Sequence, residues 1–129
     1  NYYGTPKEYV RQQLENGKDV ILEIEIQGAL KIKEQFPDTL LLFMVPPSAS
    51  VLEERLRGRG TETDEVVRKR LHRAVEESEF IEQYDYLIVN DDLETCVKET
   101  HEIIQSQHHR VDQRREFIDT LKEDLKRFL

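Results

Sequence analysis

The sequence predicts an α/β domain built on a parallel sheet. Three short apolar segments with strand character occur at residues 19–26, 39–45 and 86–89. Between them lie stretches with helical periodicity that are long enough to carry the chain from one parallel strand to the next. Because helices and strands alternate along the chain, we expect a parallel sheet flanked by helices.

Composition limits the class of protein. The chain has 129 residues, of which 37% are hydrophobic and 36% charged, as in a folded, soluble domain. Its net charge of −8 argues against nonspecific binding to nucleic acid or anionic membranes, although a local basic cluster can still bind a small anion. Cys96 is the single cysteine, which excludes an intrachain disulfide and a multi-cysteine metal site, and favours a reducing cytoplasm.

The first elements have recognisable ends. The segment TPKEYVRQQLENG predicts a helix with Thr5 as its N-cap and Gly17 as its stop. Residues 19–26 follow as a β-branched, mostly buried strand. The segment QGALKIKEQF is then expected to form a short helix that Pro37 ends.

The middle of the chain predicts a strand followed by two helices. Residues 39–45 form a continuous apolar run, which is typical of a strand covered on both faces. A helix is expected to begin near Ser48 or Ser50. Thr63 is expected to cap a longer helix over about 64–83, because acidic residues follow it in the first turn.

The last part predicts a strand and a long helical region. Residues 86–89 (YLIV) predict the third strand. From about Leu93 the pattern is helical almost to Leu129, with a break near the segment QHHR. A three-stranded parallel sheet is a thin core for this architecture. With an opening segment NYYGTP that lacks an initiator Met, this suggests that the chain is cut from something longer.

Two carboxylates stand near the end of the first predicted strand. Strand periodicity puts Glu23 and Glu25 on one face, opposite the neighbouring apolar residues. Carboxylates at the end of a buried strand are costly unless they accept hydrogen bonds or face a cation. A ligand site and an exposed sheet edge both remain open for this pair.

A cluster of arginines in the segment RLRGRGTET indicates an anion site. Arg55 and Arg59 share a helix face if the helix reaches Arg59, and the glycines on either side of Arg59 loosen its backbone. Arg70 lies in the next predicted helix and could fold back towards them. Phosphoryl transfer uses such guanidiniums, because they neutralise the phosphate oxygens once water is excluded. The alternative is a solvated helix face, salt-bridged to Glu53, Glu54, Glu62 and Glu65.

The segment IVNDD ends the predicted strand 86–89 with polar residues. Ligands of parallel sheets sit beyond the carboxyl ends of the strands, so Asn90 can contact a ligand. Asp91 and Asp92 are better explained as caps of the following helix.

Taken together, the segments NYYGTP, ILEIEIQGA, FMVPPS, RLRGRGTET, RKRL and IVNDD resemble the guanylate kinase family in order and spacing. The resemblance runs from residue 1 to about 92, with a family-like C-terminal helical region after it. It implies a P-loop NTPase-like parallel sheet with flanking helices and a helical lid, present here as a partial fold. It also implies transfer of the γ-phosphoryl group of ATP to GMP with Mg²⁺.

The resemblance implies a role for each acceptor-side residue. Tyr3 would hydrogen-bond the GMP phosphate, with Gly4 beside it in the GMP-binding turn, and Thr5 would face the guanine. Glu25 would face GMP, and Glu23 would lie near Mg²⁺, in contact through water.

On the donor side, Arg55, Arg59 and Arg70 would be the catalytic arginines that close on the phosphates. Arg55 and Arg59 would also bind ATP, and Asn90 would lie near the adenine.

By the same resemblance, residues 1–5 would end the GMP-binding segment, and 6–48 would form core. Residues 49–78 would be the lid region, and 79–129 the core strand with the C-terminal helices. The 129 residues contain no G-x-x-x-x-G-K-[ST] phosphate-binding motif, so we expect the chain alone to be inactive.

Two other functions remain open. Guanylate-kinase-like domains of membrane-associated scaffolds bind phosphopeptides without catalysis; retention of the arginines and of the EIE pair favours a catalytic parent instead. A second alternative is a structural fragment that self-associates through apolar surface that a longer chain would cover.

Overall fold

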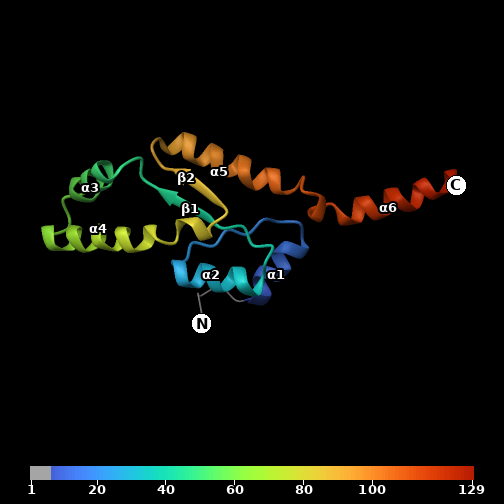
Figure 1. The fold of residues 1–129 in the computed structure, drawn as a ribbon, viewed down its shortest axis with the longest axis horizontal. Coiled ribbons are helices and arrows are strands. Elements are labelled where there is room, and N and C mark those ends of the chain that lie inside the picture. The colour runs from blue at the N-terminus through green and yellow to red at the C-terminus, as the bar shows by residue number, and fades with distance from the viewer. Residues whose placement is uncertain (1–6) are drawn as a thin grey trace. The chain divides into compact units, whose positions relative to one another are not determined.

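A computed structural model describes residues 7–129 (Figure 1). Backbone N–H groups of Asp85 and Tyr86 donate to the carbonyl of Leu41, and Asn90 N–H donates to the carbonyl of Val45, so the two strands run parallel. The elements in chain order are α1 (Lys7–Glu15), α2 (Ile26–Gln35), β1 (Leu42–Val45), α3 (Ala49–Gly58), α4 (Asp64–Ser78), η1 (Ile81–Gln83), β2 (Tyr86–Val89), α5 (Leu93–Gln107), η2 (Val111–Gln113), α6 (Arg115–Leu125) and η3 (Lys126–Phe128), where η marks a 3₁₀ turn.

The described residues divide into two compact units. Unit 1 comprises residues 7–43 and 60–87, and unit 2 comprises 44–59 and 88–129. Each strand contributes residues to both units. No helix among the described residues is long and apolar enough to cross a membrane.

Unit 1 contains α1, α2 and α4 and has a small apolar core. Its buried hydrophobic side chains are Ala29, Leu41 and Val67. The rings of Phe43 and Tyr84 meet edge to face with their centroids 4.9 Å apart, which adds a directional aromatic contact.

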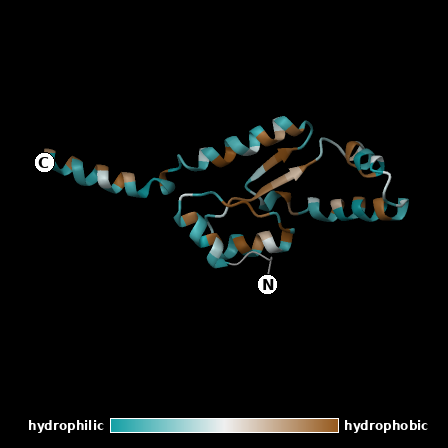
Figure 2. Ribbon diagram, turned by 180° about the vertical axis from the view of Figure 1, so that it is seen from behind, coloured by the Kyte–Doolittle hydropathy of each residue, from teal (hydrophilic) through white to brown (hydrophobic). Residues whose placement is uncertain are grey.

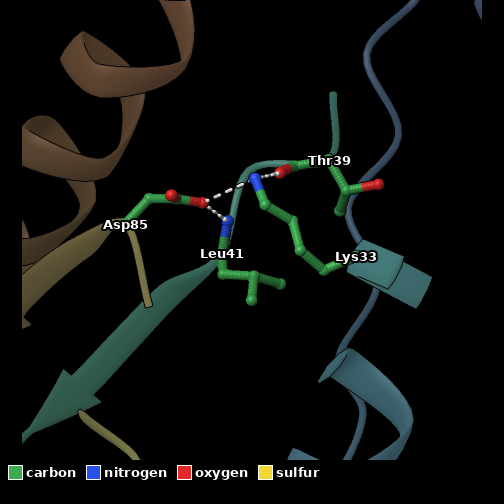
Figure 3. A network of polar contacts seen from close by, with 4 residues as sticks. All are labelled: Lys33, Thr39, Leu41 and Asp85. Carbon is green, nitrogen blue, oxygen red and sulfur yellow. Dashed lines mark hydrogen bonds and ion pairs between the residues drawn. The ribbon is translucent and has the colours of Figure 1, made fainter. Parts of the chain in front are cut away.

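A polar network joins three segments of unit 1 (Figure 3). The Asp85 carboxylate, before β2, accepts from Leu41 N–H at 2.8 Å and from Lys33 Nζ at 3.2 Å. Lys33, on α2, also donates to the carbonyl of Thr39. Because Leu41 is buried, Asp85 satisfies an amide that would otherwise lack an acceptor as the chain enters β1.

Unit 2 contains α3, α5 and α6. Its buried hydrophobic side chains are Leu56, Ile88 and Cys96. The expected break in the helical region is present, because α5 ends at Gln107 and α6 begins only at Arg115. Figure 2 shows that both strands are predominantly hydrophobic. The strand predicted at 86–89 is confirmed as β2, whereas the one predicted at 39–45 is shorter and spans only Leu42–Val45. The prediction that it is covered on both faces was wrong, because Met44 is 50% exposed.

Several predicted helix ends are confirmed. The Ser48 hydroxyl accepts from Val51 N–H at 3.1 Å, so Ser48 rather than Ser50 caps α3. The Thr63 hydroxyl accepts from Val66 N–H at 3.3 Å and caps α4. Gly17 has φ +79°, the left-handed conformation expected where α1 ends.

The prediction for the end of α4 was wrong. The helix ends at Ser78 instead of continuing to Gln83, and the 3₁₀ turn η1 follows separately. The Ser78 hydroxyl donates back to the carbonyl of Val75 at 2.7 Å. Serine hydroxyls compete in this way with the backbone hydrogen bonds that would extend a helix.

The prediction of a strand at 19–26 was also wrong, and with it the count of three strands. Residues 18–25 have no strand assignment, α2 already begins at Ile26, and the sheet within 7–129 has two strands. A strand requires hydrogen bonds to a neighbour, and the described residues supply none beside this segment. The predicted alternation nevertheless persists, because Glu23 and Glu25 are exposed whereas Leu22 and Ile24 are half-buried.

Candidate functional site

Arg55 lies in the last turn of α3 and is bound to the turn that follows β2. Its Nη1 donates to the carbonyl of Asn90 at 2.7 Å, and its Nη2 donates to the carbonyl of Asp91 at 3.1 Å. A guanidinium has five donors in a planar fork, so two adjacent carbonyls can be bridged by one side chain. Among the predicted site residues that the structure describes, Arg55 and Asn90 are in direct contact, and the contact links α3 to the turn after β2.

Arg59 has a different environment. It follows α3 in helical conformation, with φ −68° and ψ −28°, and Gly60 then turns the chain with φ +66°. Other residues rarely adopt that positive φ, so Gly60 fixes a sharp turn directly after Arg59. The Arg59 side chain is exposed and has no hydrogen-bond or ion-pair partner within residues 7–129.

Arg70 is paired within unit 1. Its Nη2 lies 2.8 Å from Oε1 of Glu62, whose side chain is only 18% exposed. The other Glu62 oxygen is buried without a hydrogen-bond partner in the described part of the chain. On α3, Arg57 likewise pairs with Glu53 at 2.9 Å. The expected salt-bridged helix face is therefore present for Arg57 and Arg70.

Glu25 is the N-cap of α2. Its carboxylate accepts from Gly28 N–H at 2.6 Å and from Gln27 N–H at 2.9 Å, satisfying two amides that the helix leaves open. Burial raises the pKa of Tyr84, and the charges of Glu25 and Glu77 raise it further.

In the turn after β2, Asn90 forms a hydrogen bond through its backbone and not, within residues 7–129, through its side chain. Asn90 N–H donates to the carbonyl of Val45 at 2.7 Å, while the half-buried Asn90 side chain makes no hydrogen bond with the described residues. Asp92, not Asp91, caps α5 by accepting from Thr95 N–H at 3.0 Å and Thr95 Oγ1 at 2.8 Å. These two hydrogen bonds hold the pKa of Asp92 below its ordinary value.

The remaining predicted site residues are Tyr3, Gly4, Thr5 and Glu23. Tyr3, Gly4 and Thr5 lie outside the described residues. Glu23 is exposed in unit 1, which also contains Glu25 and Arg70. Within residues 7–129, no group of three or more His, Cys, Asp and Glu side chains is placed to hold a metal ion.

Two contacts were missed by sequence reasoning. Glutamate is not among the residues that prefer the N-cap position, so nothing local marked Glu25 as the cap of α2. The bond of Arg55 to main-chain carbonyls also has no sequence signal, because a carbonyl is present at every residue. Spacing identified both residues as notable without indicating their partners.

A parallel strand pair and the helices that alternate with it along the chain place the chain in the α/β class. Residues 1–107 match the family model described as guanylate kinase. The chain is 54% identical over 97 residues to the guanylate kinase of Halalkalibacterium halodurans, covering 75% of this chain and 48% of that protein. It is also 54% identical over 99 residues to the guanylate kinase of Carboxydothermus hydrogenoformans, and 48% identical over 99 residues to that of Caldanaerobacter subterraneus. Both of these alignments cover 77% of this chain and 48% of the relative.

The chain therefore belongs to the guanylate kinase family. It spans about half the length of the curated relatives it matches.

Proposed function

We propose that, within a polypeptide that also supplies a phosphate cradle, this chain serves the transfer of the γ-phosphoryl group of ATP to GMP, giving ADP and GDP. Family membership and the name guanylate kinase of the relatives support this reaction. A P-loop NTPase-like sheet, a lid at residues 49–78 and a cytoplasmic location belong to the same proposal.

The environment of Arg59 is the observation that carries the proposal. Its guanidinium is exposed and has no partner within the described residues, and the turn at Gly60 ends the helix beside it. In phosphoryl transfer, negative charge spreads over the equatorial oxygens of the transferring group, and a guanidinium stabilises that charge. Arg59 can take this role without first breaking an ion pair.

Arg55 and Arg70 would act differently, because both are already engaged. Arg55 must exchange the carbonyls of Asn90 and Asp91 for phosphate oxygens, or else it acts by holding the turn on which Asn90 lies. Arg70 must leave Glu62 before it can bind a phosphate. Charge-assisted hydrogen bonds to a multiply charged phosphate are stronger than those to neutral carbonyls, so ATP favours the exchange at Arg55. For Arg70 the phosphate must instead outcompete the Glu62 carboxylate.

On the acceptor side, Tyr3, Gly4, Thr5 and Glu25 are the residues proposed to bind GMP. Guanine presents adjacent N–H donors, and a carboxylate can accept from both. Glu25 now accepts from two backbone N–H groups of α2 instead. Binding of GMP through Glu25 would therefore compete with the N-cap of α2.

Mg²⁺ is proposed to enter with ATP. A protein often binds it through one or two carboxylates together with the phosphates. The described residues form no cluster that could hold a metal ion. Glu23 offers one exposed carboxylate, which suits contact with the ion through a metal-bound water better than a complete coordination site. When bound, the ion would neutralise phosphate charge. The contribution of this chain to the same neutralisation would come from its guanidiniums.

Acceptor specificity tests the proposed function. ADP release by a longer protein containing this chain should depend on GMP and should be far slower with AMP, CMP or UMP. The 129-residue chain alone should show no GMP-stimulated release, because it lacks the phosphate-binding motif. Turnover independent of GMP, or binding of a phosphopeptide without any turnover, would refute the proposed reaction.

A further inference from the structure

Helix α6 and the turn η3 carry an exposed apolar stripe, which we call the α6 stripe. Its members within α6 recur at spacings of three and four, which places them on one helical face. Two more apolar residues continue the pattern in η3 and at the position after it. Figure 2 shows hydrophobic bands along the otherwise hydrophilic α6. The stripe consists of the half-buried Ile118 and the exposed Phe117, Leu121, Leu125, Phe128 and Leu129.

The stripe is unusually open to solvent. The residues Phe117, Leu121, Leu125 and Phe128 are 57%, 44%, 53% and 74% exposed. A covered aromatic side chain buries about 150–250 Å², so the stripe offers roughly 500 Å² of apolar surface. A contiguous apolar patch of this size on a soluble protein indicates an interaction surface. It lies beyond residue 107, where the family match ends, and the proposed function leaves it unexplained.

The charges beside the stripe argue against a strongly charged partner. Residues 114–127 carry five basic and four acidic side chains, which nearly cancel. Many of these charges pair along the helix, with Arg115 to Asp119 at 3.2 Å and Lys126 to Glu123 at 3.1 Å. An anionic membrane or nucleic acid gains little from such a face, and the net charge of −8 repels both.

The order of the apolar residues indicates that the partner is a second copy of the same helix. The apolar residues are placed symmetrically about Glu123 in the sequence. Leu121 and Leu125 are two residues from it, Ile118 and Phe128 five, and Phe117 and Leu129 six. In an antiparallel pair centred at the level of residue 123, Leu121 of one α6 therefore faces Leu125 of the other. Phe117 and Ile118 then fall towards the partner's C-terminal turn, which carries Phe128 in η3 and Leu129 after it. A two-fold interface requires this kind of self-complementarity.

We propose that the α6 stripe is a self-association surface whose occupant is α6 of a second copy of this chain, antiparallel and related by a two-fold axis at the level of Glu123. Two stripes together bury about 1,000 Å², which is at the lower end of specific interfaces. The dimer is therefore reversible and depends on concentration.

Sedimentation equilibrium of the whole chain over a wide concentration range tests the surface. The wild-type chain should show a monomer–dimer equilibrium that Leu121→Asp weakens at least about tenfold. Thr120→Asp adds the same charge at the adjacent, exposed position outside the stripe and should leave the equilibrium unchanged. Circular dichroism of both variants verifies that the helices persist. If Leu121→Asp loses helix content, Leu121→Ala, which retains a strong helix former, replaces it and should weaken the dimer in the same direction.

Cross-linking tests the register. A mixture of Leu121→Cys and Leu125→Cys chains should form disulfide-linked dimers under mild oxidation faster than either variant alone, because these positions face each other across the proposed axis. Equal rates in all three samples would overturn the register. A chain that stays monomeric, a dimer unaffected by Leu121→Asp, or a monomer that instead binds phosphatidylglycerol vesicles would overturn the proposal. None of these results depends on kinase activity.

Discussion

Arg55 and Arg59 are chemically identical and close in sequence, yet the structure assigns them different stabilising roles. Arg55→Ala removes two hydrogen bonds from a charged donor to the carbonyls of Asn90 and Asp91. Such bonds contribute about 1.5–3 kcal/mol when shielded, but Arg55 is exposed and the freed carbonyls can hydrate, so we expect about 1 kcal/mol. Arg59→Ala removes no contact with a described residue and should leave the free energy of unfolding unchanged.

Urea unfolding followed by circular dichroism measures this difference, with Arg59→Ala as the matched control. A change of about 1 kcal/mol corresponds to about 4 °C in Tm for a chain of this size. Amide hydrogen exchange should also accelerate in the turn after β2 for Arg55→Ala alone. Arg55→Lys should recover only part of the loss, since an ammonium lacks the planar fork. Equal destabilisation by the two alanine variants would refute the assignment.

Three further predictions concern stability. Asp85→Ala should destabilise the chain by about 2 kcal/mol in chemical denaturation, because the buried amide of Leu41 loses its acceptor, whereas Asp85→Asn should cost less. Because the pKa of Asp92 is lowered in the folded state, its carboxylate stabilises α5 above the ordinary Asp pKa, and this stabilisation is lost as pH falls through the lower folded-state pKa. In a pH titration of helicity, Asp92→Asn should therefore reduce the loss of helix at acid pH. Calorimetry should give this chain a lower Tm than a longer protein containing it, because its sheet has only two strands within the described residues; equal Tm values would contradict this.

The sequence predicted the starts of α3 and α4 and the end of α1 because the causes of these ends are local. Ser48 and Thr63 accept from amides three residues ahead, and Gly17 supplies a positive φ, so each signal lies within a few residues of its effect. The strand at 19–26 was wrong for the opposite reason. An alternating pattern predicts which side chains are exposed, but a strand also needs a hydrogen-bonded neighbour, and that partner is remote in sequence.

For the candidate site, the sequence suggested residues but not their partners. Spacing allowed Arg55, Arg59 and Arg70 to be either an anion-binding cluster or a salt-bridged face, and only the family resemblance favoured the first. The structure pairs Arg70 with Glu62 and binds Arg55 to backbone carbonyls, and it leaves Arg59 without a described partner. These differences depend on which segments pack together, so periodicity alone could not predict them.

The kcat of Arg59→Ala, measured in a longer guanylate kinase that contains this chain, tests the central claim most directly. An arginine that stabilises the transferring group contributes to rate rather than to folding, so kcat should fall at least about a hundredfold while Tm is unchanged. Arg59→Lys should restore part of the rate, because it keeps the charge but loses the fork. A kcat for Arg59→Ala within a few-fold of the unsubstituted enzyme would contradict the account and return Arg59 to the role of a solvated surface residue.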